Sequence, residues 1–139
     1  MIGLDTNILV YALDPTFVEH DQAKKALLSL DACAVNSTVI HETYHSLVFR
    51  RKISATDSRR KVAEFLRDKR VAFINLTKTT TLFALDLAVR TNLGGRDSLI
   101  LGCYLHNRIP EMYSHDEDLS RLKKVSAKGK ILRITDPIK

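Results

Sequence analysis

Short apolar runs alternate with helix-length amphipathic segments along the whole of this chain, and that alternation limits the folds open to it. The runs that resemble β-strands are residues 1–4, 32–36, 71–76, 111–114 and 131–134. The segments with helical character are residues 6–13, 18–30, 38–50, 57–69, 79–91 and 98–106. Alternation of this kind is typical of α/β domains with a mainly parallel sheet. We therefore expect a single α/β domain over residues 1–139, with a central sheet of about five strands flanked by helices.

The composition is ordinary for a globular protein, with 45% hydrophobic and 27% charged residues. No apolar run approaches the roughly 20 residues needed to span a bilayer, so we expect no membrane partner. The first residues show no charged leader followed by an apolar stretch. Cys33 and Cys103 show no metal-binding or redox spacing and are expected to be reduced, buried thiols. Together these features predict a cytoplasmic protein.

Four acidic residues stand at positions where a parallel sheet would bring them together. Asp5 and Asp116 each follow an apolar run that resembles a strand, and Asp97 lies where a helix should start. Glu42 lies on the third predicted helix, for which Ser37 is the expected N-cap. The carboxyl ends of parallel strands are where ligand sites form in open α/β sheets. Clustered carboxylates repel one another unless a hard divalent cation lies between them, so the pattern suggests a metal site.

Each aspartate also has a purely structural interpretation. Asp5 and Asp97 could be helix caps, and Asp116 and Asp118 could be turn formers. Capping and metal binding are compatible, because one carboxylate oxygen can cap a helix while the other binds an ion.

The net charge of +6 favours a polyanionic partner, of which nucleic acid is the commonest. Any one basic cluster could be an ordinary solvated helix face, but several together favour RNA or DNA. The clusters are residues 50–52, 59–61, 67–70 and 121–130. Because aromatic residues make up only 6% of the chain, no stacking platform for single strands is evident from the sequence.

One helix carries a competing signature, His41-Glu42-Thr-Tyr-His45, which matches the H-E-x-x-H motif of zinc proteases. On a helix the two histidines would share one side and could bind one zinc ion, with Glu42 as the general base. The longer metzincin motif is missing, because Val48 and Arg51 stand at its glycine and histidine positions. Glu64 is a conceivable third ligand. A helical wheel places Glu42 opposite an apolar arc, which leaves it free to face a cleft or solvent.

Four segments together resemble the PIN-domain ribonucleases, and among them the VapC toxins of VapBC toxin–antitoxin modules. They are L4-D-T-N-I-L-V-Y-A12, Glu42, R96-D-S-L-I100 and Y113-S-H-D-E-D118, in that order along nearly the whole chain. The resemblance implies a PIN-like α/β fold whose cleft holds Mg²⁺ or Mn²⁺. It also implies an RNA substrate, a homodimer and an antitoxin partner.

The resemblance assigns roles residue by residue. Asp5, Glu42, Asp97 and Asp116 look like the catalytic acidic quartet, and Asp118 resembles an optional fifth acid. Thr6, Asn7 and Ser114 match polar positions that support the site. Of the quartet, Asp5, Asp97 and Asp116 are expected to bind the ion with Asp118, and Glu42 to position or deprotonate the attacking water.

The basic cluster Arg59, Arg60 and Lys61 is predicted to hold the RNA backbone without reading bases. Three alternatives stay open beside the toxin interpretation. The chain could be a free-standing PIN-domain nuclease that processes RNA. It could be a non-catalytic RNA-binding module of the same fold. It could also be the zinc metalloprotease that the His41–His45 motif suggests.

Overall fold

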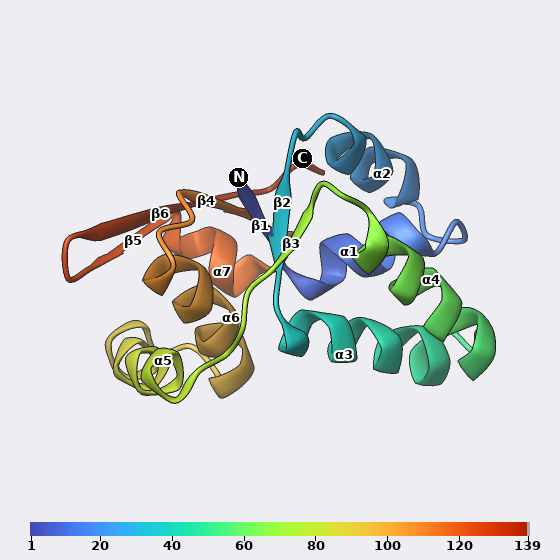
Figure 1. Ribbon diagram of the computed structural model, residues 1–139. Helices are drawn as coiled ribbons and strands as arrows, with labels where there is room; N and C mark the ends of the chain where they lie inside the picture. The colour runs from blue at the N-terminus through green and yellow to red at the C-terminus, as the bar shows by residue number, and fades with distance from the viewer. Residues whose placement is uncertain (139) are drawn as a thin grey trace.

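A computed structural model describes residues 1–138 and shows a mainly parallel sheet with helices on both sides (Figure 1). The strands lie in the order β3-β2-β1-β4-β6-β5, and only β5 runs antiparallel to its neighbour. Their bounds are β1 Ile2–Leu4, β2 Cys33–Val35, β3 Val71–Phe73, β4 Glu111–Tyr113, β5 Lys124–Ala127 and β6 Lys130–Thr135. The expected α/β fold with a mainly parallel sheet is confirmed, with six strands in the described residues.

Within residues 1–138, seven α-helices and one π-helical turn connect the strands. They are α1 Thr6–Leu13, α2 His20–Leu28, α3 Ser37–His45, η1 Ser46–Arg50, α4 Ala55–Arg67, α5 Lys78–Thr91, α6 Gly95–His106 and α7 Glu117–Leu122. Figure 1 shows α1 to α4 on the right of the strands and α5 to α7 on the left. α5 packs along α6, and α1 contacts both α2 and α3. None of the helices in residues 1–138 combines the length and apolar character that crossing a bilayer requires.

The order of the strands creates a switch point between β1 and β4. The chain builds β2 and β3 on one side of β1, and then returns to place β4 on the other side. Leu4 of β1 pairs with Tyr113 of β4, so the residues that follow these strands leave the sheet side by side. A crevice outside the carboxyl ends of the strands forms at such a reversal of strand order.

Tyr104 of α6 fixes β1 against the sheet. Its ring is fully buried, and a Cβ atom on Gly3 would lie only 2.6 Å from it, so only glycine allows this approach. The Tyr104 hydroxyl lies 2.6 Å from the Leu4 carbonyl oxygen and 3.2 Å from that of Ala34. This contact ties the end of β1 to β2 and so positions the residue that follows, Asp5.

Sequence-based expectations differ from the structure in three places. Asn36, and not Ser37, is the N-cap of α3, because its side-chain oxygen accepts a hydrogen bond from the Val39 N–H at 3.1 Å. The helix expected at residues 38–50 changes to a π-helical turn at Ser46, where the Arg51 N–H donates to the Ser46 carbonyl. The short helix α7 and the edge strand β5 were not predicted at all.

Candidate active site

The four acidic residues of the predicted quartet line one open cavity of about 680 Å³. Each comes from a different helix: Asp5 is the N-cap of α1, Glu42 lies within α3, Asp97 is in the first turn of α6, and Asp116 is the N-cap of α7. Positions thus separated by up to 111 residues meet at the carboxyl ends of β1 and β4. Thr6 and Asn7 line the same cavity.

Asp5 is the most buried of the four, with 5% of its surface exposed. One carboxylate oxygen accepts from the Thr6 N–H at 2.8 Å, and the other accepts from the Ser114 hydroxyl at 2.7 Å. Burial raises its pKa to about 6 against the effect of these hydrogen bonds, and the nearby charges of Asp97 and Asp116 add to the increase. Asp5 is therefore a carboxylate without a compensating cation among its hydrogen-bond partners.

Ser114 connects the two strand-end aspartates. Its hydroxyl donates to Asp5 and accepts from the Asp116 N–H at 3.1 Å. Asp116 caps α7 through one oxygen, Oδ1, which accepts from the Leu119 N–H at 3.0 Å. The capping role considered from the sequence is thus correct for Asp5 but not for Asp97, because Gly94 is the N-cap of α6. Asp116, which was considered only as a turn former, is also a helix cap.

Glu42 closes the cavity from the α3 side. Its Oε1 accepts from the Thr6 hydroxyl at 2.7 Å, and its Oε2 lies 2.9 Å from the Arg96 guanidinium. The Glu42 side chain is 21% exposed, so it faces the cavity and not bulk solvent. The Arg96 side chain is 73% exposed, so a bound anion could compete with Glu42 for its guanidinium.

Burial and the surrounding carboxylates both affect the pKa of Asp97. Its pKa is raised by burial and then by the charges of Asp116, Glu42 and Asp118, and only Arg96 opposes the increase. Asp118 acts on it from outside the cavity lining, because its own side chain is 69% exposed and lies 3.7 Å from Arg121.

Comparison with known protein families shows which family has this fold and cavity. The PIN domain family matches residues 2–125. The chain belongs to the PIN domain family. No curated protein matched it by sequence.

Several solved structures share this PIN fold. The crystal structure of Mycobacterium tuberculosis VapC20, a sarcin-ricin loop cleaving toxin, aligns with a TM-score of 0.77 and 20% identity over 91% of this chain and 98% of that chain. VapBC2 from Rickettsia felis, bound to a promoter DNA fragment, aligns at 0.67 and 20% identity over 98% and 100%. A toxin–antitoxin complex from Klebsiella pneumoniae aligns at 0.69 and 18% identity over 99% and 98%. At these identities the likeness concerns the fold.

The donor atoms in this PIN cavity suit a hard divalent cation. They are carboxylate oxygens, the ligands that Mg²⁺ and Mn²⁺ prefer. The side-chain oxygen of Asn7 is buried without a hydrogen-bond partner, and Asn7 lines the cavity. Among residues 1–138 no three His, Cys, Asp or Glu side chains are close enough to enclose an ion as they stand. The four acids share this cavity, and Asp116 and Glu42 lie near enough to Asp97 to raise its pKa.

The zinc-protease alternative finds little support in this geometry. His41 and His45 line the cavity on the same wall as Glu42, as their helical spacing predicts. Glu64, the conceivable third ligand, lies on α4 and pairs with Arg60 at 3.6 Å. Within the described residues, therefore, the two histidines have no third ligand beside them.

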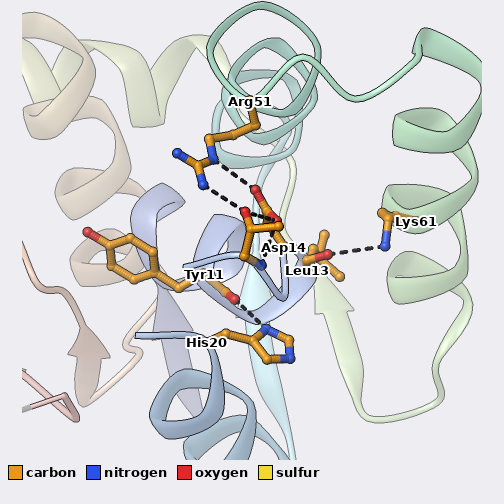
Figure 2. Close-up of polar contacts among 7 residues, drawn as sticks. Tyr11, Leu13, Asp14, His20, Arg51 and Lys61 are labelled. Atoms are coloured by element: carbon orange, nitrogen blue, oxygen red, sulfur yellow. Dashed lines mark hydrogen bonds and ion pairs between the residues drawn. The ribbon is translucent and has the colours of Figure 1, made fainter. Parts of the chain in front are cut away.

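The basic residues at the cavity are Arg50, Arg51 and Arg96, not the predicted cluster on α4. Arg59 lines a separate apolar groove between α3 and α4, and Arg60 pairs with Asp57 and Glu64. Lys61 donates to the Leu13 carbonyl at 3.2 Å (Figure 2). The proposed contact of these three residues with RNA stays a prediction. Of the four basic clusters named from the sequence, the 50–52 cluster supplies Arg50 and Arg51 to the cavity, although the sequence alone did not single it out.

Proposed function

We propose that this chain is a Mg²⁺- or Mn²⁺-dependent ribonuclease that acts as the toxin of a VapBC-type toxin–antitoxin pair. The observation that carries the proposal is the convergence of Asp5, Glu42, Asp97 and Asp116 on one cavity of a PIN domain. Nuclease chemistry accounts for a cluster of carboxylates that burial and mutual repulsion make costly. A non-catalytic RNA-binding module would gain nothing from such a cluster of carboxylates.

Each acid has a distinct part in the proposed reaction. Asp5, Asp97 and Asp116 would hold the cation, with Asp118 beside Asp97. A bound Mg²⁺ or Mn²⁺ supplies positive charge that acidifies a water and stabilises the developing phosphate charge. Ser114 and Thr6 hold the carboxylates of Asp5 and Glu42 in fixed orientations through 2.7 Å hydrogen bonds. Asn7 contributes a free side-chain oxygen.

Glu42 is the proposed base. The water oxygen would bond to phosphorus, its proton would pass to Glu42, and the phosphodiester P–O bond to the leaving oxygen would break. Because Glu42 is paired with Arg96, an RNA phosphate that attracts Arg96 would also release the carboxylate for this task. Arg96 thus links binding of the backbone to activation of the base.

The proposed partners follow from the same family relationship. An antitoxin partner is supported by the solved relatives, two of which are toxin–antitoxin assemblies. A homodimer is also proposed, as is contact of Arg59, Arg60 and Lys61 with the RNA backbone. If the neighbouring gene encodes no small DNA-binding protein that copurifies with this chain, the free-standing nuclease becomes the better description.

Asp5→Asn tests the proposed activity. The nearly isosteric change removes one charge from the acidic cavity, so cleavage of single-stranded RNA in Mg²⁺ or Mn²⁺ should fall by about a hundredfold or more. The melting temperature should be unchanged or higher, because repulsion is relieved. Activity within a few-fold of the wild type would exclude Asp5 from the site.

His41→Ala is the control, because His41 lines the same cavity from α3 but has no part in the proposed reaction. It should retain cleavage within a few-fold, whereas a zinc protease would lose all activity. Chelation by EDTA should abolish cleavage, and added Mg²⁺ or Mn²⁺, but not Zn²⁺, should restore it. Failure of the wild type to cleave any single-stranded RNA under these conditions would overturn the proposal.

A further inference from the structure

The cavity is also lined by side chains that the acidic site does not use. Among them are Tyr11, Phe17 and Arg51. We call these three residues the aromatic shelf. Tyr11 lies on α1 and Phe17 follows that helix by four positions, so the shelf and Asp5 are carried by one short stretch of chain.

The side chains of the shelf contact one another: the two rings meet face to edge, and the Arg51 guanidinium lies over the Phe17 ring. The Tyr11 and Phe17 rings are 4.9 Å apart between centroids and 74° between planes. The Arg51 guanidinium carbon lies 3.7 Å from the centre of the Phe17 ring. Phe17 and Tyr11 are only partly buried, so these rings keep surface open to the cavity.

Arg51 is held in place before any ligand arrives (Figure 2). Its Nε donates to Asp14 Oδ2 at 2.8 Å, and its Nη2 donates to the Thr16 hydroxyl at 2.8 Å. That hydroxyl in turn donates to Asp14 Oδ1 at 2.7 Å, and Asp14 is 2% exposed. The π-helical turn Ser46–Arg50 ends at Arg51, whose N–H closes it. A rigid, planar, positively charged group is thus fixed at the cavity wall.

We propose that the aromatic shelf is a nucleobase site that accepts one unstacked base of the RNA substrate. The inference rests on the proposed function and adds a choice of substrate, namely RNA with an unpaired nucleotide next to the bond that is cut. The cavity volume of about 680 Å³ is in the range of small-molecule sites and exceeds what a phosphate alone needs. Aromatic rings and guanidinium planes are the surfaces on which single-stranded RNA bases stack.

The position of the shelf supports a base and not a second phosphate. Arg51 already donates to Asp14 and Thr16 and packs against Phe17, and the Asp14 carboxylate offsets its charge. Arg50 and Arg96, both exposed at the same cavity, remain for the backbone. A backbone held by these arginines, with its phosphate at the acids, would direct one base toward Tyr11 and Phe17. Duplex RNA would have to break a base pair to fill this site.

A base-removal series tests the inference. The probe is a single-stranded RNA of about ten nucleotides, together with versions in which one base at a time is replaced by hydrogen. For the wild type, loss of the base at one position beside the cleaved bond should lower kcat/KM about tenfold or more, the range expected for a stacked base. For Phe17→Leu, which keeps an apolar side chain but no ring face, the intact RNA should be cut about tenfold more slowly. In that variant, loss of the same base should change the rate less than twofold.

Phe73→Leu is the matched control, since Phe73 is an exposed phenylalanine on β3 outside the cavity lining. It should show the full wild-type dependence on the base. Arg51→Lys is a second shelf variant that keeps the charge, and it should also lose the dependence, because lysine cannot form the fork or the flat face. Melting temperatures of all variants show that each is folded at the assay temperature.

The outcomes separate this inference from the proposed function. Cleavage with an equal base dependence in wild type and Phe17→Leu would overturn the nucleobase site and leave the ribonuclease intact. If no RNA is cleaved, binding of the same RNAs in Mg²⁺-free buffer still reports on the shelf. A base-dependent affinity that Phe17→Leu removes supports the site, and an affinity independent of the base at every position overturns it.

Discussion

Helix α1 carries a buried aspartate at each end, and the two are held in opposite ways. Asp5 caps the start of the helix and is 5% exposed, while Asp14 follows its last residue and is 2% exposed. Burial raises the pKa of Asp5 to about 6, with contributions from Asp97 and Asp116. Burial acts on Asp14 in the same direction, but hydrogen bonds from Arg51 and Thr16 bring its pKa below the ordinary value.

Burial alone therefore does not distinguish a functional carboxylate from a structural one. The difference is the partner: Asp14 has the guanidinium of Arg51, whereas Asp5 has only neutral donors and two acidic neighbours. A buried carboxylate without a cation costs stability, and it persists where another cation is to be bound. Asp14 serves the fold and, through Arg51, holds the aromatic shelf, while Asp5 is the carboxylate that we propose for the metal site.

Replacing Asp14 should cause the largest loss of stability. Asp14→Asn leaves Arg51 without its charged partner and breaks the anchor of the shelf, so the free energy of unfolding should fall by about 3 kcal/mol. Urea denaturation at pH 7 measures this change. In Asp57→Asn the lost pair with Arg60 is 3.7 Å long and more than half exposed on both sides, so the change should stay within about 0.5 kcal/mol. Equal effects at the two positions would remove the contrast between the ends of α1.

The pH dependence of stability should reveal Asp5 with the opposite sign. Its pKa is 3.8 in the unfolded chain and about 6 in the folded protein, so the folded state holds the proton more tightly. The unfolded state loses its proton first as the pH rises, and stability therefore falls between about pH 4 and pH 6. The loss should be on the order of 2–3 kcal/mol above pH 6.

Comparing wild type with Asp5→Asn isolates this contribution. In Mg²⁺-free buffer the difference in unfolding free energy should grow in favour of Asp5→Asn from pH 4 to pH 7. Added Mg²⁺ should reduce the difference at pH 7, because the ion binds the ionised folded form. Parallel stability curves for the two proteins over this range would show that the Asp5 carboxylate is not destabilised by its surroundings.

The three aspartates of the cavity could be predicted from the sequence because each lies at a local signal. Asp5 and Asp116 follow strand-like runs, Asp97 lies in the first turn of a helix, and the parallel topology brings such ends together. The pairs that complete the site are not local. Arg51 meets Asp14 across 37 positions, and Arg96 meets Glu42 from a different helix. No periodicity marks such pairs, and Phe17 lies in a connection without any pattern.

The helical pattern of the sequence was also misleading at Ser46, where the α-helix changes to a π-helical turn. A continuous helix over residues 38–50 would carry Arg50 and Arg51 around with the wheel of α3, but the π-helical turn at Ser46 adds a residue and redirects both to the cavity. Predicted helical faces were reliable up to that point: Val39, Ile40 and Thr43 are buried, and Glu42 faces the cavity. Similarly, α7 and β5 are short, with six and four residues, and their charged positions hide the pattern.

The smallest expected effect concerns the basic cluster on α4. If Arg59, Arg60 and Lys61 contact the RNA backbone, replacing all three with alanine should weaken binding and flatten its salt dependence. Each lost phosphate contact lowers the log–log slope by about 0.7 for a single strand. Arg60 already pairs with two carboxylates and Lys61 with the Leu13 carbonyl, so we expect a change of one contact, from Arg59, and not three.

Binding of a single-stranded RNA in Mg²⁺-free buffer at several salt concentrations measures that slope. Arg50→Ala is the comparison, because Arg50 lines the cavity and is exposed, and its loss should lower the slope by a similar single contact. The single-turnover cleavage rate at saturating RNA should stay nearly unchanged in the triple variant, since α4 supplies none of the cavity's acids. A slope altered by Arg50→Ala but not by the triple variant would place the RNA path along the cavity mouth and exclude α4 from it.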